Sequence, residues 1–196
     1  IVRLSKLRSI WFLTDVRSPM GIRSVYSTRA GVRLKPCSMG QEIERKFLVA
    51  DPSFLTSLSG SHVKQGYIPG KTRSAARIRI RDGVGFLTIK SETRGITRSE
   101  FEYKIPLEDA EEMLDILCDQ PLIEKTRYLV EWKSHVWEVD VFQGDNEGLI
   151  VAEIELATAD QGFAKPPWLG REVSLDARYF NSNLARTPYV NWRDRE

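Results

Sequence analysis

Charged and apolar side chains alternate along several segments, and this alternation constrains the fold more than any other feature of the sequence. In the first segment, Glu42-Ile43-Glu44-Arg45-Lys46, a period of two predicts a β-strand with Glu42, Glu44 and Lys46 on one face. Carboxylate oxygens suit a hard divalent cation such as Mg²⁺, and a lysine suits a phosphate oxygen. Taken alone, however, such a segment is more often a solvent-exposed strand of mixed charge.

Similar patterns predict the other elements of the chain. Further strands are predicted at 63–68, 76–81, 85–90, 98–105, 124–132, 136–142 and 149–156. Asp82-Gly83, between two of these strands, is a strong hairpin signal. A helix is predicted from Pro106 to about Asp119, because apolar residues recur at helical spacing and acids occupy its first turn. Shorter helical segments are predicted at 51–58, 158–163 and from Asp176 to about Ala185.

Two arrangements of about eight strands fit this pattern. One is a flat sheet with a wet, charged face that is backed by helices. The other is a closed barrel with the charged faces inside, which has room for a small ligand. Charges in an empty lumen would be costly, whereas divalent cations and a polyanion would balance them. We therefore expect a mainly β (α+β) fold, a closed eight-stranded antiparallel β-barrel with a charged lumen and flanking helices.

The predicted lumen would carry charges of both signs from widely separated strands. Its basic candidates are Lys46, Arg77, Arg79, Lys90, Arg98, Lys125 and Arg127. Its acidic candidates are Glu42, Glu44, Glu100, Glu102, Asp140, Glu153 and Glu155. The apolar residues on the opposite faces, among them Phe101, Tyr103, Ile105, Trp132 and Trp137, are expected to pack the strands against helices.

The remaining composition excludes several classes of protein. The two cysteines, Cys37 and Cys118, and the two histidines, His62 and His135, are isolated, which argues against a disulfide framework, a zinc cluster or a histidine metal site. No apolar run approaches the roughly 20 residues of a membrane span, and no P-loop motif is present. Residues 39–196 hold 21 basic and 26 acidic residues, which argues against nonspecific binding of nucleic acid.

The first 38 residues differ from the rest in charge, with eight basic residues and one acid. This leader fits an upstream segment that precedes a true start at Met39 or Met20, an organellar transit peptide, or a basic tail that binds an anion. We expect residues 1–38 to be poorly ordered and residues 39–196 to form one domain. The expected location is the cytoplasm, or an organelle if the leader is a transit peptide.

The charged motifs occur in the order found in the CYTH superfamily, the triphosphate tunnel metalloenzymes, which this chain resembles over about residues 40–190. The motifs are Glu42-x-Glu44-x-Lys46, Arg77-x-Arg79, Lys90, Arg98-x-Glu100-x-Glu102, Lys125-x-Arg127, Asp140 and Glu153-x-Glu155. Trp168 to Ser174, followed by Asp176 and Tyr179, is similar to the C-terminal stretch of the short bacterial members. Any one motif is weak, but the ordered set is specific.

This resemblance implies a β-tunnel that binds a triphosphate and a metal-dependent attack of water on its terminal phosphoryl group. One or two Mg²⁺ or Mn²⁺ ions would be held by Glu42, Glu44, Glu153 and Glu155, with Asp140 as a further candidate. The phosphates would be bound, and the developing charge stabilised, by Lys46, Arg77, Arg79, Lys90, Lys125 and Arg127, with Arg98 as a further substrate-binding residue. Glu100 and Glu102 would orient the basic side chains, and Tyr67 would tune substrate choice or pack.

Inorganic triphosphate, cleaved to pyrophosphate and phosphate, is the substrate that the compact chain favours within this family. Thiamine triphosphatase or a general nucleoside triphosphatase is the alternative. An adenylate cyclase is less favoured, because the His-Phe element that usually precedes E-x-E-x-K in that class is not seen. A noncatalytic polyphosphate-binding module is the rival from another class. The expected partner is a small polyanion, with no specific nucleic acid and no membrane, and the expected assembly is a monomer or homodimer.

Overall fold

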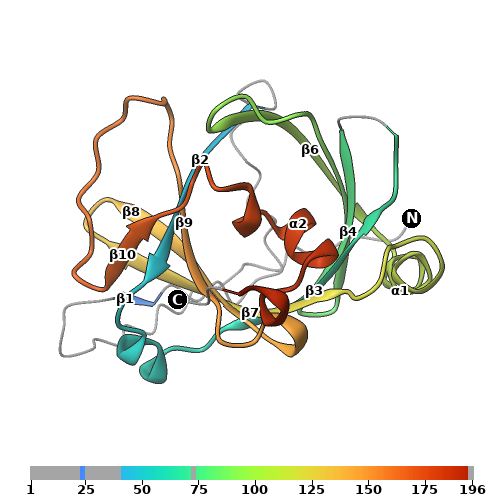
Figure 1. Ribbon diagram of the computed structural model, residues 1–196, viewed down its shortest axis with the longest axis horizontal. Coiled ribbons are helices and arrows are strands. Elements are labelled where there is room, and N and C mark those ends of the chain that lie inside the picture. The colour runs from blue at the N-terminus through green and yellow to red at the C-terminus, as the bar shows by residue number, and fades with distance from the viewer. Residues whose placement is uncertain (1–22, 25–40, 72–73, 194–196) are drawn as a thin grey trace, which may run out of the picture.

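The computed structural model describes residues 23–24, 41–71 and 74–193 (Figure 1). The strands are β1 Arg23–Ser24, β2 Gln41–Val49, β3 Ser61–Ile68, β4 Ala75–Arg81, β5 Val84–Lys90, β6 Thr97–Ile105, β7 Ile123–Trp132, β8 His135–Phe142, β9 Ile150–Glu155 and β10 Leu169–Glu172. The α-helices are α1 Leu107–Ile116 and α2 Asn181–Arg186. Short 3₁₀ turns are η1 Ser53–Ser57, η2 Gly144–Asn146, η3 Ala177–Tyr179 and η4 Tyr189–Asn191.

Eight of the strands form a closed antiparallel barrel. Neighbouring strands are hydrogen-bonded in the order β7-β3-β4-β5-β6-β2-β9-β8. The last strand, β8, pairs with the first, β7, and this pairing closes the ring. Figure 1 looks into this ring, with β6 and β4 on one side and β2, β9 and β8 on the other. The two remaining strands lie outside the ring, β1 on β7 and β10 on β2. The predicted fold class, a closed eight-stranded antiparallel barrel with flanking helices, is confirmed.

The strand register brings charged residues of separate strands opposite one another. Glu44 lies opposite Glu155 and Lys46 opposite Glu153 on β2 and β9. Directly opposed residues in an antiparallel pair project to the same face of the sheet. The same register rule joins Lys90 to Glu100 on β5 and β6, and Arg127 to Asp140 on β7 and β8. The alternation seen in the sequence thus becomes a charged lumen.

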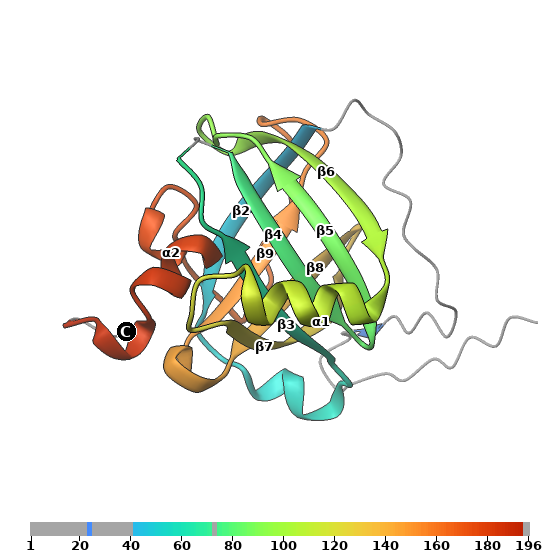
Figure 2. The ribbon, with the colours of Figure 1, turned by 90° about the vertical axis from the view of Figure 1, so that its right-hand side faces the viewer.

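Two apolar clusters cover the outside of the barrel, and a third lies on the lumen face of its strands, where Val151 is opposite Asp140 and Phe142 is opposite Lys125. Phe47, Trp137 and Trp168 lie in a cluster beside β2, β8 and β9, and none of the three is more than 2% exposed. On another side, α1 packs Ala110 and Leu114 against Ile78 of β4, and Figure 2 shows this helix lying across β3, β4 and β5. The third cluster joins β7, β8 and β9 to the C-terminal turns, and α2 lies at one end of the barrel (Figures 1 and 2).

Three predictions about the helical segments are wrong in whole or in part. Residues 158–163 form turns and irregular chain, because Phe163 packs edge-on against Trp137 and the Gln161 side chain accepts a hydrogen bond from the Ala157 amide. The helix expected to reach Asp119 ends at Ile116. The final helix is divided into η3 and α2, and the predicted cap Asp176 accepts its hydrogen bond at the start of η3.

Two outward-facing aromatic residues also differ from expectation. Phe101 and Tyr103 of β6 were expected to pack against a helix, but they are 51% and 58% exposed. The reason is the placement of α1, which contacts β4 and β5 and leaves the outer face of β6 uncovered. Ile105, at the end of the same strand, does pack beside α1. Trp137 is buried as expected, and Trp132 is partly buried against the cluster that contains Phe47, Trp137 and Trp168.

Most of the predicted leader lies outside the described residues. Within residues 1–38 only Arg23 and Ser24 are described, and they pair with Glu131 and Val130 of β7. The predictions about the order and origin of the remaining leader residues stay predictions. In the ranges that the structure describes, no helix combines the length and apolar character needed to cross a membrane.

Candidate active site

The lumen buries most of the basic residues that the sequence analysis selected. Lys46, Arg77, Arg79, Lys90, Lys125 and Arg127 are each at most 9% exposed. The Arg98 side chain is 23% exposed. Basic side chains are seldom this buried unless they have anionic partners. Their partners in the lumen are the predicted carboxylates, which lie among them in three connected groups.

The first group joins β7, β8, β9 and β2. Asp140, which is fully buried, accepts from Lys125 Nζ at 2.5 Å and from Arg127 Nε and Nη2 at 2.6 and 2.5 Å. Arg127 Nη2 also donates to Glu153 at 3.0 Å. Lys46 then bridges Glu153 and Glu44. Both oxygens of Asp140 are therefore occupied by basic side chains.

The second group joins β2, β5 and β6. Arg98 Nε donates to Glu42 at 2.6 Å, and a second guanidinium nitrogen of Arg98 lies 3.8 Å from Glu44. Lys90 Nζ lies 3.4 Å from Glu42 and forms an ion pair with Glu100. Lys90 thus contacts a carboxylate on each of the two neighbouring strands, Glu42 of β2 and Glu100 of β6.

The third group lies on β4, β5 and β6. Arg79 Nη2 donates to Glu102 Oε2 at 2.7 Å and Arg77 Nη2 to the same oxygen at 3.3 Å. The Thr88 hydroxyl contacts both Arg77 and Glu102. The Nε atoms of Arg77 and Arg79 are buried and have no hydrogen-bond partner. A buried unpaired donor costs free energy, and an anion that reached these two N–H groups would remove that cost.

The pKa shifts of the basic residues report the balance of charge around each of them. Burial, together with the nearby Arg77, lowers the pKa of Lys90 to about 8. Burial and Arg77 likewise lower the pKa of Arg79 to about 10. Burial lowers the pKa of Lys125 to about 8, although Asp140 opposes the shift. For Lys46, burial is outweighed by Glu153 and Glu44, which raise its pKa.

Two carboxylates of the lumen also have lowered pKa values, because nearby cations stabilise their charged form. Burial raises the pKa of Glu100, but Lys90 and Arg77 outweigh it and hold that pKa well below its usual range. Burial also opposes ionisation of Glu153, and Lys46 and Arg127 again lower its pKa. These groups are therefore ionised at neutral pH despite their burial. A lumen with ionised groups of both signs is suited to an ionic ligand.

The carboxylates that were predicted as metal ligands lie on the neighbouring strands β2 and β9. Glu42, Glu44 and Glu153 contact basic side chains of the lumen, and Glu155, opposite Glu44, is exposed. Across residues 41–71 and 74–193, no three acidic, histidine or cysteine side chains form a cluster that could hold an ion by themselves. This donor set still fits Mg²⁺, which usually takes one or two carboxylates and completes its coordination with water and substrate phosphate oxygens.

Tyr67 of β3, the predicted specificity residue, lies among the charged residues of the lumen. Its hydroxyl accepts from Gln65 Nε2 at 3.2 Å. Burial raises the pKa of Tyr67, while the positive charges of Arg77 and Arg98 oppose that rise. The phenol therefore stays neutral and can act as a hydrogen-bond donor in the lumen.

Several polar residues that were not predicted also contact the site. Thr88 is fully buried between the arginines and Glu102. Glu138 of β8 forms an ion pair with Arg127, and Asn181 of α2 accepts from Lys125 Nζ at 3.4 Å. Alternation places Thr88 and Glu138 on the charged faces of their strands, so it could have selected both. Asn181 has no such signal, because its position depends on how the C-terminal turns fold back.

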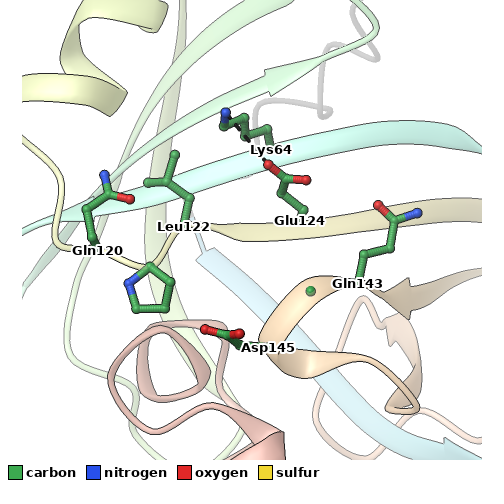
Figure 3. A pocket seen from close by; sticks show the side chains of 8 residues that line it. Lys64, Gln120, Leu122, Glu124, Gln143 and Asp145 are labelled. Carbon is green, nitrogen blue, oxygen red and sulfur yellow. Dashed lines mark ion pairs between the residues drawn. The ribbon is translucent and has the colours of Figure 1, made fainter.

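A pocket outside the barrel has different chemistry. Its volume is 290 Å³, and its lining includes Lys64, Glu124, Gln143 and Asp145 (Figure 3). Lys64 Nζ lies 3.7 Å from Glu124, and Asp145 adds a second carboxylate to the lining. Such a surface does not attract a polyanion, whereas the lumen, with its buried basic residues, does, and we take the lumen as the candidate active site.

Comparisons with known proteins identify a family and relatives of this chain. The CYTH domain family matches residues 40–188. A protein of Acetivibrio thermocellus named inorganic triphosphatase is 46% identical over 156 residues, which are 80% of this chain and 100% of the relative. An inorganic triphosphatase of Nitrosomonas europaea is 40% identical over 74% of this chain and 96% of its own length. A crystal structure of an inorganic triphosphatase has a TM-score of 0.54 and 35% identity, over 74% of this chain and 93% of that one.

Proposed function

The chain belongs to the CYTH domain family, and from that premise we propose that it hydrolyses inorganic triphosphate to pyrophosphate and phosphate. The enzyme is then a hydrolase that acts on phosphoric anhydrides, and its activity depends on a divalent metal ion. Two relatives that carry the name inorganic triphosphatase align with most of this chain and with nearly their whole length, which supports this choice of substrate.

One observation carries the proposal: the lumen holds buried arginine donors that have no partner. Arg77 and Arg79 lie two residues apart on the same face of β4, and their Nε atoms make no hydrogen bond. Arginine presents its donors in a planar fork that matches phosphate oxygens. A linear triphosphate carries enough negative charge to balance a lumen in which burial and like charge already lower the pKa of Lys90 and Arg79.

The roles of the individual residues follow from their contacts. Arg77, Arg79 and Lys90 bind phosphate oxygens from the β4–β5 side, and Lys125 and Arg127 bind them from β7. Lys46 and Arg98 lie between these groups and the carboxylates of β2 and β9. Phosphoryl transfer depends mainly on positioning and on neutralising charge in the transition state. The basic residues therefore contribute to catalysis as well as to binding.

The carboxylates of Glu42, Glu44, Glu153 and Glu155 would hold Mg²⁺ or Mn²⁺, as one or two ions. When bound, such an ion polarises phosphate oxygens and lowers the pKa of a coordinated water. Asp140 was predicted as a further ligand. We assign it to the orientation of Lys125 and Arg127, because both of its oxygens accept hydrogen bonds from those residues. Glu100 and Glu102 orient Lys90, Arg77 and Arg79 in the same way.

The test is release of phosphate from inorganic triphosphate by the full chain, with Mg²⁺, with Mn²⁺ and with EDTA. ATP and thiamine triphosphate are assayed in parallel. We expect fast, metal-dependent release from inorganic triphosphate alone. Preferential release from an organic triphosphate would keep the reaction type and change the substrate. Binding of triphosphate without any release would favour a noncatalytic polyphosphate-binding module and would contradict the proposal.

Glutamine substitutions of two proposed metal ligands, compared with the same substitution of an acid outside the barrel, test whether these carboxylates hold the metal ion. Glu44→Gln and Glu153→Gln keep side-chain size and remove the negative charge, so metal-dependent turnover should fall at least about 100-fold, a loss of the size seen when one hydrogen-bond donor that stabilises a transition state is removed. Glu124→Gln is the control, because this acid lies outside the barrel beside Lys64. Retained turnover in Glu44→Gln and Glu153→Gln would exclude a metal role. The cytoplasmic location and the monomeric or homodimeric state stay predictions.

A further inference from the structure

Thr88 is an uncharged side chain that contacts two charged side chains of the lumen, Arg77 and Glu102. It lies in the middle of β5, with Arg77 opposite it on β4 and Glu102 opposite it on β6. It is fully buried. A buried hydroxyl in a strand needs hydrogen-bond partners, and Thr88 finds both of its partners among the side chains that line the lumen.

The hydroxyl of Thr88 uses both of its hydrogen-bonding functions. Its oxygen accepts from Arg77 Nη2 at 3.1 Å. Its O–H group donates a hydrogen bond to Glu102 Oε2 at 2.9 Å. A hydroxyl can donate once and accept as well, so Thr88 links a cation to its counter-ion. Valine has nearly the same shape as threonine and could form neither hydrogen bond.

These contacts determine which arginine nitrogens remain open. Glu102 Oε2 also accepts from Nη2 of Arg77 at 3.3 Å and from Nη2 of Arg79 at 2.7 Å. The Nη2 atoms of both arginines are thus engaged by the Thr88–Glu102 pair, while their buried Nε atoms have no partner. A guanidinium is planar, so fixing one nitrogen restricts the directions in which the others can donate.

We propose that Thr88 is a positioning residue, which holds Arg77 and Glu102 so that the open guanidinium donors of Arg77 and Arg79 are aligned for a triphosphate. This inference rests on the proposed function for the identity of the anion. Thr88 acts through the arginines and not on the phosphate itself. Its hydroxyl, and not its volume, carries the effect, so serine can replace it and valine cannot.

The test measures three quantities in the full chain: the Kd of inorganic triphosphate in EDTA by calorimetry, KM and kcat with Mg²⁺, and the Tm. Thr88→Val should raise Kd and KM about tenfold, the effect of one hydrogen bond to a charged group, with a smaller change in kcat. Thr88→Ser keeps the hydroxyl, so its Kd and KM should stay within about twofold of the wild-type values. Thr126→Val is the matched control, because Thr126 lies on the outer face of β7 and contacts Gln143.

A double-mutant cycle tests whether Thr88 acts through Arg77. In an Arg77→Met background, Thr88→Val should change Kd by clearly less than tenfold, because only the contact of Thr88 with Glu102, and through it with Arg79, remains. An unchanged tenfold effect in that background would overturn the inference, as would wild-type Kd and KM in a folded Thr88→Val protein. If Thr88→Val fails to fold, Thr88→Ser against Thr88→Ala provides the same comparison, because these two variants differ only in the hydroxyl.

The same measurements separate this inference from the proposed function. Weak triphosphate binding by Thr88→Val, combined with a wild type that binds but does not hydrolyse, would support the role of Thr88 and refute the hydrolase. Hydrolysis by the wild type with no effect of Thr88→Val would refute the role of Thr88 alone. A wild type that does not bind triphosphate would refute both.

Discussion

Asp140 provides the sharpest test of how the lumen is held together, because it is the fully buried anion between two buried cations. It accepts from Lys125 Nζ and from two nitrogens of Arg127. Asp140→Asn keeps the size of the side chain and removes its charge. Lys125 and Arg127, each at most 9% exposed, then lose a counter-ion that water cannot replace. The expected result is a less stable fold, even without any ligand.

The size of this loss in stability depends on the partners that Lys125 and Arg127 keep. Breaking a buried ion pair costs about 3–5 kcal/mol. Arg127 keeps Glu138 and Glu153 as partners. Lys125 can lose its proton, because burial already lowers its pKa to about 8. We therefore expect the lower end, a loss of about 3 kcal/mol in the free energy of unfolding, and a Tm lower by about 6–12 °C for a domain of this size.

The assay is equilibrium unfolding in urea at pH 7 in EDTA, with the m-value compared between variants. Glu138→Gln is the control, because the Glu138 side chain also pairs with Arg127 but is 40% exposed, and exposed pairs contribute about 0–1 kcal/mol. A loss below about 1 kcal/mol for Asp140→Asn, at unchanged m-value, would refute the reasoning. A stable Asp140→Asn protein that needs more Mg²⁺ for half-maximal activity would instead identify Asp140 as a metal ligand.

Three further predictions concern pH and packing. Glu100 and Glu153 have folded-state pKa values below their ordinary value of 4.5, so their contribution to stability is present above that pH and is lost as the pH falls below it; urea unfolding between pH 7 and pH 3 measures this loss. Lys90, with a pKa lowered to about 8, should lose its charge at higher pH, so the affinity for inorganic triphosphate in EDTA should fall between pH 7 and 9, and Lys90→Met should flatten that profile. Gly66→Ala would place a methyl group 2.7 Å from Cys118 Cβ, an overpacking that should cost about 1–3 kcal/mol in the same unfolding assay and that a wild-type free energy would contradict.

The barrel could be predicted from the sequence because its strands carry a strong period of two. Most of the barrel strands have charged residues facing the lumen and apolar residues facing outward, and the hairpin signal at Asp82-Gly83 joins two of them as expected. An exception is β3, which turns Val63, Gln65 and Tyr67 to the lumen and Lys64 outward. The strand β10 was missed, since it has four residues with no alternation and gains its pairing only from contact with β2. The helix wrongly predicted at 158–163 fails for a similar reason: the contacts of Phe163 with distant aromatic rings outweigh a weak local preference.

The candidate site was predictable as a set of residues but not as a network. Alternation selected the charged positions, and the order of the motifs suggested their chemistry. Which cation meets which carboxylate depends on strand order and register, and these are properties of the closed barrel. Thr88 illustrates the limit, because its hydrogen bonds become visible only when β4 and β6 are placed on either side of β5.

Lys46 and Lys90 demonstrate what barrel closure adds to the chemistry. Both are lysines in lumen-facing positions, both are 7% exposed, and burial lowers the pKa of each. Lys46 lies between Glu44 and Glu153, so its net pKa shift is upward, whereas Lys90 lies near Arg77 and its pKa falls to about 8. Equal burial therefore yields opposite shifts, and the neighbours across the strands decide the sign. The β4–β5 wall, where positive charge is in excess, is consequently the part of the lumen that gains most from an anion.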